Sequence, residues 1–223
     1  SPVMVVVGNP PYSGISSNMG EWISGLIDDY KYVDGEYFAE RKHWLHDDYV
    51  KFIRFGEYFI QRTGEGVLAY INNHGFLDNP TFRGMRWHLL QTFDKIVIID
   101  LHGNANKKES APDGGKDENV FDIQQGVSIN LFVRTNKKKK GALGQVFHAD
   151  LFGKRQAKYT TLLNNSLDQL DLKPLNCVSP YFFFQPTDER SRDDYAAGFA
   201  LNDLFGLLSN GVTTARDGLV IDM

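Results

Sequence analysis

Val3-Met4-Val5-Val6-Val7-Gly8 is an apolar run, rich in β-branched residues, that directly precedes Asn9-Pro10-Pro11-Tyr12. Such a run predicts a buried strand of a parallel sheet, and ligands of open α/β sheets bind just beyond the carboxyl ends of these strands. Two consecutive prolines fix φ near about −65° and remove two backbone donors, while their carbonyl groups can still accept. Asn9 adds a side-chain acceptor, and Tyr12 adds a flat apolar face with a polar tip. The strand end therefore suits a planar ligand with an amino group at its edge.

Hydrophobic spacing after this segment alternates between helical and strand patterns. The sequence predicts a helical turn or two around 20–30, a helix over 44–62, a strand over 66–71, a helix over 80–93 capped by Asn79, and a strand over 95–101. Strands and helices that alternate in this way indicate a right-handed parallel α/β sheet.

The chain after residue 102 has a different pattern. Residues 103–125 are polar and contain glycine, which predicts a mobile loop. Strands over 127–134 and 143–148, joined by a turn at 137–141, predict an antiparallel hairpin at the end of the sheet. A helix and linker are expected over 151–174, and an aromatic, loop-rich extension over 175–223, in which 181–184 packs on the sheet.

Composition restricts the functional classes. The chain has 223 residues, 42% hydrophobic residues and a formal net charge of −4, so it is not a basic nucleic-acid-binding module overall. Its single cysteine, Cys177, excludes an internal disulfide and a cysteine-rich zinc site, and no metal site is predicted. No apolar run approaches about 18 residues, so no membrane span is expected. We therefore expect a cytoplasmic protein.

Asn9-Pro10-Pro11-Tyr12 after a hydrophobic strand resembles the catalytic motif of amino-group DNA methyltransferases, especially those that act on adenine N6. The resemblance implies that Asn9 and Pro10 accept hydrogen bonds from the target amino group and that Tyr12 stacks on the flipped base, with Pro11 completing the motif. It also implies S-adenosylmethionine as cofactor. The fold implied is a partial Rossmann-like class I methyltransferase sheet, with parallel strands and helices, ending in an antiparallel hairpin.

The resemblance extends over roughly residues 3–149. Residues 100–104 and 118–127 look like adenine methyltransferases fused within large restriction-modification polypeptides, including the single-chain nuclease–helicase–methylase type. In that family an aromatic residue of this segment lines the pocket for the target base, and Phe121 matches it. The alternative is that Phe121 is an ordinary core phenylalanine. The implied partners are double-stranded DNA with a flipped adenine, fused nuclease or helicase domains, and a target-recognition region beyond residues 175–223.

The sequence also departs from that family. The glycine-containing loop and the acidic residues that hold the cofactor normally precede the catalytic motif, and only eight residues precede Asn9 here. We therefore expect residues 1–150 to be the second, catalytic half of a methyltransferase domain whose first strand has an exposed edge. The cofactor-binding residues cannot be assigned, and the isolated chain is expected to be inactive.

Several polar residues have a simpler interpretation. His74 and Asp100 stand at strand ends and are interpreted as structural residues. Lys137–Lys140 is interpreted as a solvated hairpin tip. Arg83 and Arg86 are interpreted as parts of a solvated helix face. The function expected from the whole pattern is site-specific adenine-N6 methylation of DNA within a restriction-modification protein. Two alternatives are methylation of RNA or of a protein amide nitrogen, and a non-catalytic DNA-binding module derived from the same fold.

Overall fold

The computed structural model describes residues 2, 4–12, 14, 16–38, 43–135, 137–187 and 198. The chain divides into two units, Ser1–Pro186 and Thr187–Met223, and the second lies almost wholly outside the described residues. The predicted extension is therefore described only as far as residue 187. Within the described ranges, no helix is both long enough and apolar enough to cross a membrane.

A mixed sheet of six strands forms the centre of the first unit, in the order β1-β4-β6-β5-β7-β8. The strands are β1 (Val5–Gly8), β4 (Gly66–Asn73), β5 (Lys95–Asp100), β6 (Val127–Arg134), β7 (Gln145–Asp150) and β8 (Lys173–Leu175). β1 is parallel to β4 and β5 is parallel to β7, whereas β6 runs antiparallel between β4 and β5. The carboxyl ends of β1, β4, β5 and β7 therefore share one edge of the sheet. A separate two-stranded sheet joins β2 (Tyr32–Val33) to β3 (Glu36–Tyr37).

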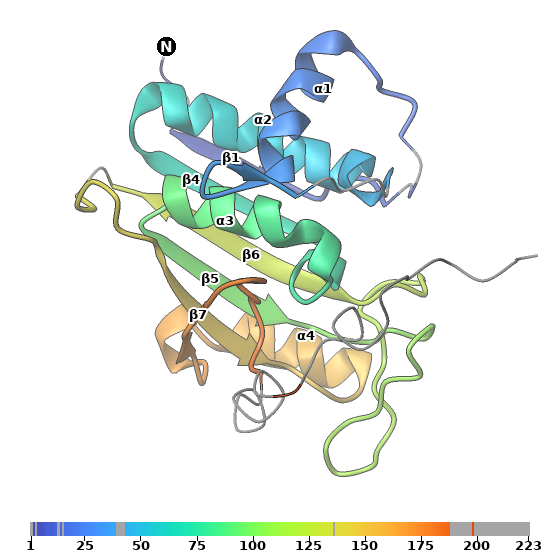
Figure 1. The fold of residues 1–223 in the computed structure, drawn as a ribbon. Helices are drawn as coiled ribbons and strands as arrows, with labels where there is room; N and C mark the ends of the chain where they lie inside the picture. Colours follow the sequence, from blue (N-terminus) through green and yellow to red (C-terminus); the bar gives the residue numbers. More distant parts are fainter. Residues whose placement is uncertain are drawn as a thin grey trace, which may run out of the picture. The chain divides into compact units, whose positions relative to one another are not determined.

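Helices cover both faces of the sheet (Figure 1). Helices α2 (Asp48–Thr63) and α3 (Arg83–Thr92) lie on one face with α1 (Glu21–Asp28) beside them, and α4 (Arg155–Asn164) lies on the other. Short 3₁₀ turns lie between these elements: η1 (Asp29–Lys31), η2 (His43–His46), η3 (His74–Phe76), η4 (Pro80–Phe82) and η5 (Leu167–Gln169). The predicted cap is confirmed, since the Asn79 side chain accepts from the backbone N–H of Thr81 at 3.0 Å.

The predicted antiparallel hairpin is wrong, although both of its strands form. β5 lies between β6 and β7, and β7 pairs with β5 in parallel. Five of the six β5 residues are buried, as expected for a central strand whose two faces are both covered. The segment after β6 also binds the end of α3. Lys138 donates to the carbonyl oxygens of Leu90, Gln91 and Phe93 there. Lys138 is thus not at a solvated hairpin tip.

β1 is the outermost strand of the sheet within the described residues. Val5 and Val7 are 64% and 76% exposed, while Val6 packs against the main core. The apolar run was predicted as buried, and here only one of its faces is covered. The exposed edge expected for this strand is observed.

The segment after β8 packs on the same face as α3. Phe182 and Phe184 are buried in the main core, which confirms the predicted packing of 181–184. Arg86, predicted on a solvated face, is fully buried. Its guanidinium donates to Phe76 O (2.6 Å), Asn79 O (2.9 Å) and Tyr181 O (2.7 and 2.9 Å). These carbonyl groups stand at the end of η3, at the start of η4 and in the segment after β8, so Arg86 joins three segments inside the core.

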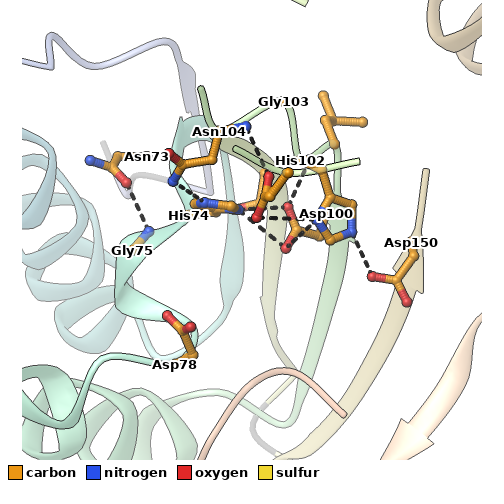
Figure 2. A network of polar contacts seen from close by, with 12 residues as sticks. Asn73, His74, Gly75, Asp78, Asp100, His102, Gly103, Asn104 and Asp150 are labelled. Carbon is orange, nitrogen blue, oxygen red and sulfur yellow. Dashed lines mark hydrogen bonds and ion pairs between the residues drawn. The ribbon is translucent and has the colours of Figure 1, made fainter. Parts of the chain in front are cut away.

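A polar network lies at the carboxyl edge of the sheet (Figure 2). His74 Nδ1 lies 3.0 Å from Asp100 Oδ1, and Asn104 Nδ2 lies 3.0 Å from His74 Nε2. The backbone N–H of Lys107 donates to Asn104 Oδ1, so the amide nitrogen of Asn104 faces His74. Nε2 must therefore accept, and the Nδ1 proton donates to Asp100. A Cβ on Gly126 would lie 2.3 Å from the His74 ring, so this close packing requires glycine.

His102 extends the network to β7. Its Nε2 lies 2.8 Å from Asp150 Oδ1, and its ring stacks on Phe152 with centroids 3.8 Å apart. Burial alone would lower the pKa of His102. The hydrogen bond to Asp150 and the nearby carboxylates of Glu109, at 3.9 Å, and Asp100 outweigh burial and raise that pKa to about 9.

Replacing Arg86 tests its role in the core. Arg86→Met keeps an apolar side chain in place but leaves the carbonyl groups of Phe76, Asn79 and Tyr181 without these donors. We expect the free energy of unfolding, measured by urea denaturation, to fall by about 3–5 kcal/mol. The control is Arg62→Met on exposed α2 surface, which should change it by less than about 0.5 kcal/mol. Equal effects of the two substitutions would contradict this account.

The protonation of His102 gives stability a pH dependence. Its folded pKa, about 9, lies above the ordinary value of 6.5, so its contribution is fully present below pH 6.5 and is lost as pH rises through 9. Urea denaturation from pH 6 to 9.5 should show stability falling with pH. His102→Gln should flatten that slope, and Asp150→Asn should reduce it. A slope that persists unchanged in His102→Gln would refute the assignment.

Candidate functional site

Asn9-Pro10-Pro11-Tyr12 follows β1 at the carboxyl edge of the sheet. The Tyr12 hydroxyl lies 2.7 Å from Asn9 Oδ1 and 3.1 Å from Ile71 O, so its single proton is shared between these two acceptors. Gly8 pairs with Tyr70, which places Ile71 of β4 beside the turn. Asn9 is exposed and Pro10 is buried. The turn is therefore fastened to β4 by Tyr12, and it presents a carboxamide to solvent.

Tyr12 is held as a neutral, half-buried ring. Burial raises the pKa of Tyr12 to about 12, so its hydroxyl remains a hydrogen-bond donor near neutral pH. The Asn9 oxygen has two lone pairs and accepts one hydrogen bond from Tyr12, which leaves a second direction for another donor.

Tyr12 and Phe121 pack against the same small apolar cluster. Its buried members are Ile99, Leu101, Val120 and Val127, and both aromatic residues lie partly buried against it. Tyr12 and Phe121 make no ring contact with each other in the described structure. The fold thus brings these two predicted residues to one cluster from distant parts of the sequence.

Phe121 also lines a cavity of about 640 Å³ formed largely by the loop between β5 and β6. Neighbouring lining residues include Asn104, Glu109, Ile123 and Arg155. Asn9 and Tyr12 do not line this cavity. The structure therefore places Phe121 between the shared apolar cluster and a cavity of its own loop.

The loop that carries Phe121 was predicted to be mobile, but buried contacts fasten it. The side chains of Asp117 and Lys158 are fully buried and lie 2.8 Å apart. Asp117 accepts from the backbone N–H groups of Gly103 (2.6 Å) and Gly153 (2.7 Å). Lys158 also donates to Leu101 O and Glu118 O. Sequence reasoning missed this pair, because nothing near Lys158 in the sequence distinguishes it from a surface lysine.

His74, Asp100 and His102 could offer metal ligands by position alone. One ligand atom of each lies within 4.8 Å of the others. Both ring nitrogens of His74 are already hydrogen bonded, however, and Asp100 accepts from His74 and from the backbone of His102. These hydrogen bonds give the three residues a structural role in supporting the loop, as interpreted from the sequence. We assign no metal to the cluster.

The described strand ends do not form a cradle for S-adenosylmethionine. Such a cradle needs free backbone N–H groups in a glycine-rich loop after a strand. Here the prolines after β1 have none, and the N–H groups of Gly75, His102 and Gly103 donate to Asn73, Asp100 and Asp117. The residues present at these strand ends therefore do not fit a cofactor cradle of this kind.

Comparison with known proteins gives a family for part of the chain. Residues 4–106 match the family model described as Eco57I restriction-modification methylase. The match includes Asn9–Tyr12 and ends before Phe121. No curated protein matches the sequence.

Solved structures share the fold. The ATP-dependent type ISP restriction-modification enzyme LlaBIII bound to DNA is 22% identical with a TM-score of 0.70, and the DrdV–DNA complex is 24% identical with a TM-score of 0.69. A nuclease-deletion mutant of the type ISP enzyme LlaGI, in complex with a DNA substrate mimic, is 19% identical with a TM-score of 0.68.

Each similarity covers 86% of this chain but only 13%, 19% and 16% of the LlaBIII, DrdV and LlaGI chains, respectively. The predicted α/β fold class, with its central sheet and covering helices, is confirmed. Residues 4–106 are therefore similar to Eco57I restriction-modification methylases, and the chain shares its fold with part of the type ISP restriction-modification enzymes.

Proposed function

We propose that this chain carries the target-base site of a DNA methyltransferase that methylates adenine N6 within a restriction-modification protein. The observation that supports it most is the exposed Asn9 carboxamide at the end of β1, beside a Tyr12 ring fastened to β4. The methylase family of residues 4–106 supports methyl transfer. The DNA bound to LlaBIII, DrdV and LlaGI supports DNA as the partner.

The chemistry of an adenine amino group explains why such a site is needed. Its lone pair is conjugated with the ring, so the nitrogen is a poor nucleophile. Asn9 Oδ1 and the Pro10 carbonyl would accept its two N–H groups, favour a tetrahedral nitrogen and localise the lone pair. Because the acceptors are held by a rigid turn, they need little reorganisation as charge develops. The methyl donor implied by the family is S-adenosylmethionine.

The aromatic residues address the cost of extruding the base. Removing an adenine from the duplex costs a few kcal/mol. Stacking on an aromatic side chain returns about 1–3 kcal/mol per contact. Tyr12 supplies one such surface, and Phe121, packed on the same apolar cluster, supplies the second. Because the two rings do not contact each other, a planar base inserted between them would displace no existing stack.

Other acceptors would pose the same chemical problem. An amino group of RNA or a protein amide also has a conjugated nitrogen lone pair, and a non-catalytic DNA-binding module could retain the same turn. Assays of the intact protein with DNA, RNA and peptide acceptors separate these alternatives. Transfer to RNA or peptide but not to DNA, or site-specific DNA binding without turnover, would displace the DNA methylation proposal.

The Asn9 carboxamide is tested in the intact protein that contains this chain. Asn9→Ala should lower the methylation rate at least about 100-fold, as for the loss of one preorganised polar contact to a transition state. S-adenosylmethionine affinity, measured by calorimetry, should stay nearly constant. The control is Asn164→Ala at an exposed position of α4, which should leave the rate unchanged. A normal rate in Asn9→Ala would reject its catalytic role.

The isolated chain of residues 1–223 is expected to transfer no methyl group. The backbone N–H groups that could hold the cofactor are absent or already hydrogen bonded at the three strand ends. Incubation with DNA and radiolabelled S-adenosylmethionine should give no labelled DNA, while the intact protein serves as the positive control. Labelling of DNA by the isolated chain would refute this expectation.

A further inference from the structure

Three side chains of α4 bind four consecutive carbonyl groups of the loop that carries Phe121. Lys158 Nζ donates to Glu118 O at 2.7 Å, and Arg155 Nε donates to Asn119 O at 2.7 Å. The Tyr159 hydroxyl donates to Val120 O, and Arg155 Nη2 donates to Phe121 O at 2.9 Å. Arg155, Lys158 and Tyr159 are three and four positions apart, so they share one face of the helix. We call these three residues the α4 clamp.

The clamp fixes the backbone of a segment that belongs to no strand or helix. All four of its carbonyl groups accept from the clamp. The amide group of Phe121 is also bonded, since it donates to Asn119 Oδ1 at 2.9 Å. The Asn119 amide in turn donates to Gly103 O and Gln125 O, which joins the two ends of the loop. With both of its backbone groups bonded, Phe121 can change direction mainly by rotation of its own side chain.

The buried charge of Lys158 is not explained by stability alone. Lys158 and Asp117 are buried as an ion pair, and desolvation offsets much of the Coulomb attraction in such pairs. Apolar residues of similar volume often stabilise a core equally well, whereas buried polar groups can specify one geometry. A network that binds every carbonyl from 118 to 121 specifies the path of the backbone more narrowly than apolar packing would.

We propose that Arg155, Lys158 and Tyr159 are positioning residues for the target base: they hold residues 118–121 so that the Phe121 ring forms one wall of the pocket opposite Tyr12. This inference rests on the function proposed above. The clamp acts through Phe121 and does not touch the base. It therefore should affect the stacking and the turnover of the extruded base, and not the binding of the cofactor.

The test measures kcat/KM of the intact methyltransferase on a duplex with adenine at the target, and fluorescence on a matched duplex with 2-aminopurine there, because 2-aminopurine lacks the 6-amino group that is methylated. The fluorescence lifetime of 2-aminopurine reports whether the extruded base is stacked. Tyr159→Phe removes one hydroxyl bond from a clamp residue whose ring is retained, and should lower kcat/KM about 2–10-fold. Arg155→Ala removes the bonds to Asn119 O and Phe121 O as well as the ion pair with Asp122, and should lower kcat/KM about 10–100-fold. Both should increase the long-lifetime, unstacked component, with unchanged affinity for S-adenosylmethionine.

A double-mutant cycle separates positioning from general destabilisation. If the clamp acts through Phe121, Arg155→Ala should add little to the loss already caused by Phe121→Ala. The control is Arg62→Ala, an exposed arginine that contacts Tyr58 on α2 and should change neither kcat/KM nor the lifetime. Melting temperatures identify any variant that unfolds. Tyr159→Phe should destabilise the fold least, because it keeps the aromatic ring.

The outcomes separate failure of the positioning role from failure of the proposed function. Additive losses in the double mutant, or folded clamp variants with normal kcat/KM and lifetimes, would overturn the positioning role even if Asn9→Ala abolishes methylation. Normal turnover in Phe121→Ala would overturn it as well. If the intact protein methylates no DNA, or Asn9→Ala has no effect, the proposed function fails first and this inference fails with it.

Discussion

The direction of β6 is the constraint on which the rest of the structure depends. Since β6 runs antiparallel between β4 and β5, the carboxyl ends of β1, β4 and β5 meet at one edge of the sheet, and the chain enters β6 at that same edge. The Asn9–Tyr12 turn, the His74 network and the loop that carries Phe121 are thereby brought together. Reversing any of these strands would move its polar end to the opposite edge.

Local sequence patterns predicted the elements well, because strand composition, helix periodicity and the Asn79 cap are properties of neighbouring residues. They predicted the pairing of β7 wrongly. The alternation in 127–134 and 143–148 is compatible with a hairpin, and only the observed pairing, with β5 between β6 and β7, excludes it. The prediction that Arg86 lies on a solvated face was wrong because the carbonyl groups that it binds are up to 95 residues away in the sequence.

Only part of the candidate site could be predicted from local sequence. Asn9–Tyr12 was predictable, since the strand, the prolines and the carboxamide are adjacent in the sequence and only a family resemblance was needed to interpret them. Phe121 was proposed from resemblance alone, and its support was not foreseen. Lys158 and Asp117 are 41 positions apart by their numbers and have no shared pattern, so only coordinates reveal that they are a buried pair.

The two walls of the proposed pocket are therefore held by different physical means. Tyr12 is fixed by proline geometry and by one carbonyl of β4, so its position is set mainly by covalent structure within four residues. Phe121 depends on tertiary hydrogen bonds from a helix on one face of the sheet. Changes at Arg155, Lys158 or Tyr159 of α4 should therefore act on the pocket through Phe121, whereas, within the described residues, no hydrogen bond of Tyr12 involves α4.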